Sequence, residues 1–127
     1  MDWKALSYLY SGKNCDILIT GDRSSPGEKE LMEQFELPKL EILLAGHHGS
    51  ESSTSFDLLE ETQPDTVIIS VDKNNNYGHP NEKLLRRLRI FHCRILRTDK
   101  HGNIIISQSL VVDCSRSWYV IGRDILL

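Results

Sequence analysis

The sequence predicts an α/β fold in which one partly parallel sheet carries the helices that connect its strands. Short apolar runs of strand length alternate along the chain with segments that place hydrophobic residues at helical spacing. Gly, Pro and Asn residues separate these segments, as is typical of turns and loops. Helices that alternate with strands favour parallel pairing and right-handed crossovers. The 127 residues are enough for one domain with its own hydrophobic core.

The first part of the chain predicts a hairpin, a helix and a buried strand. Residues 3–10 and 15–20 are strand-like segments joined by a turn at 11–14, so we expect an antiparallel hairpin. After a polar loop, residues 28–36 have apolar side chains at helical spacing. Residues 40–45 form a mainly apolar run that ends at a glycine, which is typical of a buried strand.

The rest of the chain continues the alternation. The expected elements, in chain order, are a short helix capped within 52–55, a central strand at 66–71, a helix at 80–90, a strand at 93–96, a hairpin turn at 100–103 and a returning strand at 104–106. Residues 110–112 and 118–121 are further strand candidates. We therefore expect several strands to end at the same edge of one sheet.

Composition excludes several classes of protein. The 15 Lys and Arg residues against 18 Asp and Glu residues give a formal charge of −3, so no global basic field indicates nucleic-acid binding. No apolar run is long enough to span a bilayer and the start is not a signal peptide, so we expect a soluble chain without direct membrane insertion. The odd number of cysteines, Cys15, Cys93 and Cys114, argues against a disulfide framework and favours packing roles.

Three polar loops that follow strand-like runs carry side chains capable of metal binding. Asp22 lies in the first loop, His47 and His48 in the second, and His79 in the third. Because the carboxyl ends of parallel strands meet at one edge of a sheet, we expect these loops to converge. A carboxylate and imidazoles there could hold a divalent ion and lower the pKa of its bound water.

The second loop also offers hydroxyl groups, and each candidate residue could instead have a purely structural role. Ser50 and Ser53 could hold a phosphate or carboxylate oxygen of a substrate, although Ser53 is also a plausible helix cap. Asp22 could cap a loop or helix, His47 and His48 could bond to backbone carbonyls, and His79 could simply start a helix. His92 and His101 are isolated and fit surface or turn positions better than metal ligation.

Five motifs, in this order and spacing, resemble the metallo-β-lactamase-fold domain of ComEC-type competence proteins. They are ITGD at 19–22, GHHGS at 46–50 with Ser53, ISV at 69–71, NYGHP at 76–80 and RTD at 97–99 with Gly102. The resemblance extends to about residue 106 and corresponds to the C-terminal half of that domain. It implies half of an αββα sandwich, with one mixed sheet and helices on one of its faces.

The resemblance also implies an activity. Domains of this family are thought to be metal-dependent phosphodiesterases or nucleases that degrade one DNA strand during uptake. It implies that Asp22 and His48 bind the divalent metal, zinc or manganese. It further implies that His47 lies beside the metal or contacts substrate, and that His79 assists a phosphate oxygen or the leaving group.

The chain departs from the family pattern because it contains no HxHxDH motif. In the family that motif and another histidine ligand belong to the N-terminal half, so Asp22 and His48 cannot complete a two-metal cage alone. We expect a partial domain whose uncovered sheet face forms a homo-oligomer or binds a complementary half-domain. The alternatives are a non-catalytic half-domain that acts through such association and a hydrolase with another substrate.

Overall fold

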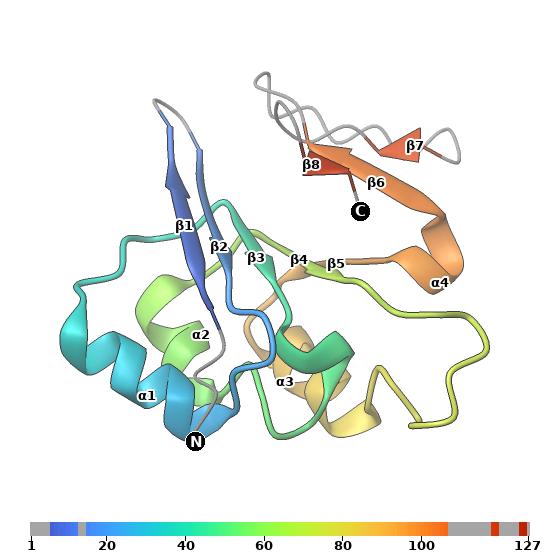
Figure 1. Cartoon of the computed structure of the whole chain (residues 1–127), viewed down its shortest axis with the longest axis horizontal. Helices are drawn as coiled ribbons and strands as arrows, with labels where there is room; N and C mark the ends of the chain where they lie inside the picture. Colours follow the sequence, from blue (N-terminus) through green and yellow to red (C-terminus); the bar gives the residue numbers. More distant parts are fainter. Residues whose placement is uncertain (1–5, 13–14, 107–117, 120–124, 127) are drawn as a thin grey trace.

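A five-stranded mixed sheet forms the centre of the molecule. The computed structural model describes residues 6–12, 15–106, 118–119 and 125–126. The strands follow the order β1-β2-β3-β4-β5 (Figure 1), and their bounds are Tyr8–Ser11, Asp16–Ile19, Ile42–Leu44, Thr66–Ile69 and Arg94–Arg97. β1 pairs with β2 in antiparallel fashion, whereas β2, β3, β4 and β5 are parallel. The predicted α/β class and the N-terminal hairpin are therefore confirmed.

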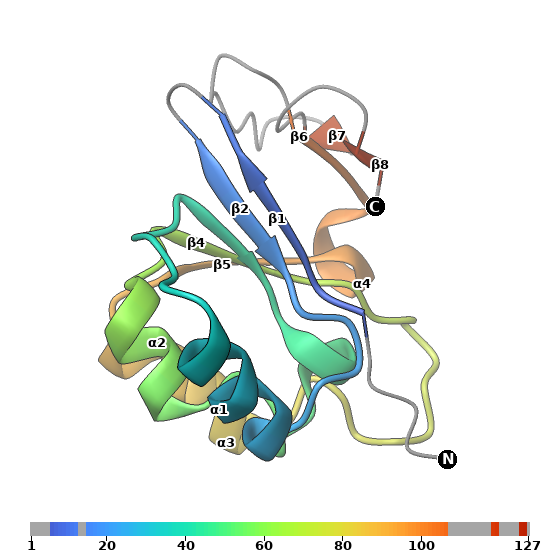
Figure 2. The same ribbon diagram turned by 60° about the vertical axis from the view of Figure 1, so that its left-hand side comes forward.

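Three helices cover one face of this sheet, as Figures 1 and 2 show. They are α1 (Ser25–Gln34), α2 (Phe56–Thr62) and α3 (Glu82–Ile90). The first begins before residue 28 because Pro26 occupies its first turn, where a missing backbone N–H is tolerated. Each helix follows one of the polar loops, so the helices position the loops against the edge of the sheet.

The caps of α2 and α3 differ slightly from the predicted boundaries. The Oγ of Ser55 accepts a hydrogen bond from the backbone N–H of Leu58 at 3.2 Å, within the predicted capping segment. The Oδ1 of Asn81 accepts from the N–H of Lys83 at 2.8 Å, so α3 starts after residue 80. Side-chain caps therefore determine where both helices begin.

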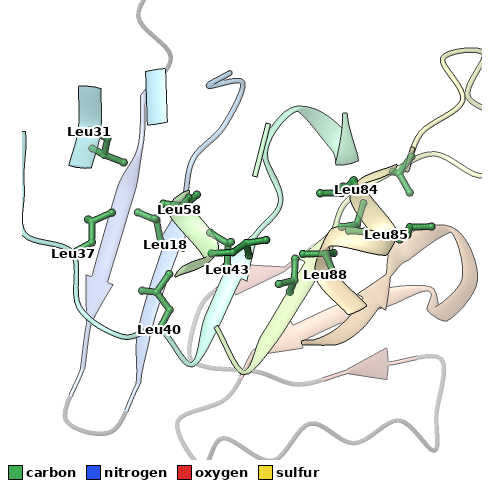
Figure 3. Close-up of a cluster of buried hydrophobic side chains, with 13 residues drawn as sticks. Leu18, Leu31, Leu37, Leu40, Leu43, Leu58, Leu84, Leu85 and Leu88 are labelled. Atoms are coloured by element: carbon green, nitrogen blue, oxygen red, sulfur yellow. The ribbon is translucent and has the colours of Figure 1, made fainter. Parts of the chain in front are cut away.

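Leucine side chains from the helices and the sheet form the main hydrophobic core (Figure 3). Leu18 and Leu43 point from the sheet toward Leu58 and Leu88, and all four are at most 1% exposed. Successive strand residues face opposite sides of a sheet, so the residues next to these leucines point away from the helices. The apolar runs of the strands therefore supply two separate cores.

The second core lies on the opposite face of the sheet and contains Ile17, Ile42, Leu44, Ile68 and Leu96, together with Ile104 and Ile106 of β6 (Asn103–Ile106). Every one of these side chains is at most 8% exposed. The expectation of a bare second face is therefore wrong for this part of the sheet, because β6 packs there. At the edge strand β1, Tyr8 and Tyr10 remain exposed.

The predicted hairpin after β5 is wrong. Thr98–His101 forms a short helix, α4, and β6 leaves the five-stranded sheet. β6 pairs in parallel with β7 (Trp118–Tyr119) and in antiparallel fashion with β8 (Ile125–Leu126). At the start of α4 the guanidinium of Arg97 binds both carboxylate oxygens of Asp99, at 3.0 and 2.7 Å.

The remaining predictions concern single segments. The strand candidate at 110–112 lies outside the described residues, and the candidate at 118–121 is confirmed only over Trp118–Tyr119. No helix in the described part of the chain has the length and apolar character needed to cross a membrane.

Cys15 and Cys93 are partly buried free thiols, whereas Cys114 lies outside the described residues. Burial, with smaller effects from the carboxylates of Glu41 and Asp16, raises the pKa of the Cys15 thiol to about 11. Burial likewise raises the pKa of Cys93. Thiols with raised pKa values are poor nucleophiles and poor metal ligands at neutral pH, which agrees with packing roles.

Helix α3 offers a test of this core. We expect Leu88→Ala to lower the free energy of unfolding by about 2–5 kcal/mol, because it opens a cavity at a fully buried position. Ile90→Ala is the matched control, since Ile90 is 63% exposed on the same helix, and it should cost well under half as much. Urea denaturation followed by circular dichroism measures both. Equal losses would contradict the described packing of α3.

Candidate functional site

The three polar loops predicted to converge do so at the carboxyl ends of β2, β3 and β4. The backbone N–H of His47, after β3, donates to the carbonyl of Gly21, after β2, at 2.9 Å. The N–H of Asn81, at the end of the loop that follows β4, donates to the carbonyl of Gly49 at 2.9 Å. These bonds join the loops into one surface at a single edge of the sheet.

The two histidines lie in a tight turn rather than in an extended segment. Both have left-handed backbone angles, with φ of 51° for His47 and 54° for His48, within the turn Gly46–Gly49. Residues with a Cβ adopt this conformation only when their surroundings enforce it. At Gly49, where φ is 85°, a Cβ would lie 2.7 Å from the Cβ of Pro80, so this position requires glycine.

The ring of His48 has a defined hydrogen-bonding state. Its Nδ1 lies 2.7 Å from the backbone carbonyl of Ser70, just beyond β4. A carbonyl only accepts hydrogen bonds, so Nδ1 must carry the proton. In a neutral imidazole Nε2 is then the unprotonated nitrogen, which is the arrangement usual for a histidine that binds a metal through Nε2. The structural alternative for His48, an imidazole bonded to a backbone carbonyl, is therefore correct for Nδ1. The bond leaves the lone pair of Nε2 available to a metal ion.

His79 forms a row of rings with its neighbours. Its centroid lies 6.1 Å from that of His47, in a T-shaped arrangement, and 5.9 Å from that of Tyr77. Partial burial, and secondarily the neighbouring His47 and His48, lower the pKa of His79. The neutral imidazole is therefore favoured at neutral pH, and it can donate one hydrogen bond and accept another.

Asn75 holds the loop that carries His79. Its Oδ1 accepts hydrogen bonds from the N–H groups of His79 at 3.0 Å and Tyr77 at 3.2 Å. Its Nδ2 donates to the carbonyls of His79 at 2.8 Å and Asp72 at 2.9 Å. One side chain thus satisfies four backbone groups of a polar loop, and it orders the segment between β4 and α3.

Asp22 lies at the surface directly after Gly21, whose φ is 63°. The N-cap of α1 is Ser24, so a helix-capping role does not apply to Asp22 there. The second predicted ligand, His48, is also exposed. Both predicted ligands are accessible from solvent, and their role in metal binding stays a prediction.

A complete metal cage is absent from the described part of the chain. No group of three or more His, Cys, Asp or Glu side chains among those residues is arranged to hold a metal ion. Asp22 and His48 offer suitable donor chemistry, but the donors that the described residues bring together do not fit the two-metal centre implied by the resemblance. Whether the ligand set of the whole chain is incomplete stays a prediction.

The two predicted substrate-binding serines have partners within the protein. The Oγ of buried Ser53 donates to the carbonyl of Arg23 at 2.6 Å, and Ser50 Oγ lies 2.9 Å from Ser52 Oγ. The cap of α2 is Ser55 rather than Ser53 or Thr54. Substrate binding by Ser50 and Ser53 stays a prediction, while the structure assigns Ser53 a role in joining the first two loops.

Two charged side chains hold the loop that follows the histidine turn. The carboxylate of Glu28, fully buried on α1, accepts hydrogen bonds from the N–H groups of Thr54 at 2.5 Å and Ser55 at 2.9 Å. The guanidinium of Arg87, on α3, donates to the carbonyls of Ser53 at 3.0 Å and Thr54 at 2.8 Å. Opposite charges from two helices therefore bind the donors and the acceptors of the same short loop.

A pocket of about 370 Å³ opens beside the row of rings. Its walls comprise His48 and His79, Val71 two residues beyond β4, and residues of the 72–77 loop, namely Asp72, Asn74, Asn75, Asn76 and Tyr77. The pocket is therefore lined by amide groups, aromatic rings and one carboxylate, with no Lys or Arg among its lining residues.

Sequence reasoning missed Glu28, Arg87, Asn75 and Tyr77. In the sequence Glu28 indicates only a favourable charge near a helix start, and Arg87 only part of a solvated helix face. Their partners lie 26 or more residues away along the chain, so no local pattern reveals them. The three consecutive asparagines close to a histidine are the one signal in the sequence for Asn75 and Tyr77.

We expect Glu28→Ala to lower the free energy of unfolding by about 2–4 kcal/mol, because it removes two charge-assisted hydrogen bonds and leaves two N–H groups unpaired. Glu28→Gln keeps one acceptor oxygen and should lose less. Glu33→Ala, an exposed position on the same helix, is the control and should change stability by less than about 0.5 kcal/mol. Denaturant titration measures the three variants, and equal losses at Glu28 and Glu33 would refute the role of Glu28.

Comparisons with known proteins place this site in context. The chain is 45% identical over 87 residues to the ComE operon protein 3 of Bacillus subtilis, a stretch that covers 68% of this chain and 11% of that protein. It is 34% identical over 87 residues to the competence protein ComA of Neisseria gonorrhoeae, covering 68% and 13% of the two chains. It is 33% identical over 96 residues to the recombination protein 2 of Haemophilus influenzae, covering 76% and 12%.

No family model and no solved structure matches the chain significantly. The matched segments are little more than a tenth of the length of these relatives. The identities, which extend over more than two thirds of this chain, support its relationship to a family of competence proteins.

Proposed function

We propose that the chain is part of a metal-dependent phosphodiesterase that acts on DNA during DNA uptake. Its relatives carry names that refer to competence and recombination, and those processes involve DNA. The proposed centre lies where β2, β3 and β4 end, at the surface that Asp22, His48 and His79 share. The metallo-β-lactamase-like character of the fold belongs to this proposal and rests on the motif order in the sequence.

The observation that carries the proposal is the state of His48. Its Nδ1 donates to the carbonyl of Ser70 at 2.7 Å, which leaves Nε2 as the unprotonated nitrogen on an exposed side chain. A histidine used only for packing has no need of this orientation, whereas a metal-binding histidine commonly has such a bond to its second nitrogen. Asp22, exposed at the end of the neighbouring strand β2, supplies the oxygen donor of the proposed pair.

His79 and His47 are proposed to act on the phosphodiester. Neutral His79 can donate a hydrogen bond to a phosphate oxygen or to the departing oxygen, and its lowered pKa favours that neutral form. His47, with its ring centroid 6.1 Å from that of His79, is close enough to contact the same phosphate. Ser50 and Ser53 remain proposed contacts for other oxygens of the substrate.

Among the described residues, only part of this centre is present. Fewer than three potential metal-binding side chains gather at any point among the described residues, and this supports the proposal that further ligands come from another polypeptide segment. We propose a complementary half-domain as that source. A zinc or manganese ion, when bound to the completed site, would supply the charge stabilisation that phosphoryl chemistry requires.

A second candidate function is a non-catalytic half-domain that acts through association. It is favoured by the same incomplete donor set and by edge strand β1, where Tyr8, Leu9 and Tyr10 are between 44% and 61% exposed. An unpaired edge strand with exposed apolar side chains can pair with another chain. The proposed partner is a second copy of this chain or a complementary half.

Metal binding separates the two candidates. We expect the full chain to bind at most one zinc or manganese ion, weakly, and to cleave single-stranded DNA slowly in a reaction that EDTA abolishes. Asp22→Asn and His48→Asn should remove both the binding and the cleavage. Asn is chosen at position 48 because it tolerates the left-handed backbone there. Isothermal titration calorimetry and a labelled-oligonucleotide assay provide the measurements.

His92→Asn is the matched control, since His92 is exposed and has a φ of 56°, nearly that of His48. It should leave metal binding and cleavage unchanged. Two tightly bound ions per chain would contradict the partial centre. A complete lack of metal binding, or cleavage that survives both site variants, would reject the phosphodiesterase and leave the association candidate.

A further inference from the structure

We propose that Tyr77 is a stacking platform for one base of single-stranded DNA, and that it makes the site select unpaired strands. The inference rests on the proposed function for its substrate class, DNA. It assigns a binding role to a side chain outside the predicted metal and catalytic set. The occupant is the flat face of a nucleobase, placed in the pocket beside His79.

The exposure of Tyr77 is the first observation. Its side chain is 83% exposed, the largest value among the large hydrophobic side chains in the described part of the chain. An aromatic ring so exposed contributes little to folding, because it buries little apolar area. Exposed aromatic rings at a nucleic-acid site stack on bases, and every base has a π face that can be used.

The second observation is that the ring stands on a fixed loop. The N–H of Tyr77 donates to Oδ1 of Asn75 at 3.2 Å, and Asn75 is bonded in turn to Asp72 and His79. The ring lies 5.9 Å from the ring of His79, with an angle of 36° between their planes. A ring that is already positioned loses little conformational entropy when a ligand stacks on it.

The third observation is the order of the rings. Tyr77, His79 and His47 follow one another with centroid separations of 5.9 and 6.1 Å. A base stacked on Tyr77 would lie next to His79, and a phosphate of the same strand could then reach the two histidines. Tyr77 would then recognise the base, while the neighbouring His79 and His47 would act on the adjacent phosphate.

The chemistry at the Tyr77 end of the pocket favours a base, whereas the proposed function places the phosphate at the His79 end. Asp72, Asn74 and Asn76 line it beside Tyr77, and no Lys or Arg does. The carboxylate of Asp72 repels a phosphate, whereas the amides of Asn74 and Asn76 can bond to the edge of a base. In a duplex the base faces are already stacked and the edges already paired, so only an unpaired strand can enter without a cost in unstacking.

The test measures binding of the full chain to a fluorescent single-stranded oligonucleotide by anisotropy in EDTA, where no cleavage occurs. We expect Tyr77→Ala to weaken binding about 5- to 150-fold, while Tyr77→Phe, which keeps the ring, stays within about twofold. An oligonucleotide of the same length made of abasic sites should bind weakly to the unchanged protein, and Tyr77→Ala should not weaken it further. A duplex of the same sequence should behave like the abasic strand.

Phe35→Ala serves as the control, because Phe35 is a 59% exposed aromatic residue at the far end of α1, and it should bind like the unchanged chain. Three results would overturn the inference. Tyr77→Ala could bind as tightly as the unchanged chain, Tyr77→Ala could weaken binding of the abasic strand by the same factor as binding of the normal strand, or no form of the chain could bind at all. Because the assay contains no metal, it does not depend on metal binding by Asp22 and His48. Tyr77-dependent binding without metal-dependent cleavage would support the platform and reject only the phosphodiesterase.

Discussion

The loop at residues 51–55 is held between a buried carboxylate and a guanidinium, and the rest of the site depends on this pair of contacts. Glu28 binds two N–H groups of the loop and Arg87 binds its carbonyls, so the backbone is satisfied on both sides. Thr54 has a left-handed φ of 55° between them. Its Oγ1 accepts from the N–H of Gly46 at 3.2 Å, and this bond fixes the start of the histidine turn. Glu28 on α1 and Arg87 on α3 thereby determine, through the 51–55 loop, the conformation of the histidine turn Gly46–Gly49.

The parallel sheet explains why such local contacts create a shared surface. β2, β3 and β4 end at the same edge, so the turn after β3 can bond to the loop after β2 and to the segment after β4. Backbone bonds from His47 to Gly21 and from Asn81 to Gly49 make that connection, and the ring of His48 adds a third through Ser70. His79, His47 and Tyr77 then stand in a row along that edge.

Local patterns in the sequence predicted the elements that depend on hydrophobic periodicity. The β-branched run at 66–71 contains β4, and the apolar run at 40–45 contains β3. The convergence of the three loops followed from parallel pairing alone. The hairpin after β5 was wrong because Gly102 and Asn103 look like a turn, while Thr98–His101 forms α4, which the N–H of Gly102 closes by donating to the carbonyl of Thr98. The left-handed histidines and the roles of Glu28 and Arg87 could not be predicted, since their causes are contacts between distant segments.

The central claim is that the fold holds His48 with its Nδ1 bonded to Ser70 and its Nε2 free to bind a ligand. Long-range ¹H–¹⁵N correlation spectra of the ¹⁵N-labelled chain report which imidazole nitrogen carries the proton, and His48→Asn assigns the signal. With the ring in its neutral form, we expect His48 to be the Nδ1–H tautomer. The exposed ring of His92 serves as an internal comparison. The Nε2–H tautomer at His48 would contradict the claim, because Nδ1 could not then donate to the Ser70 carbonyl.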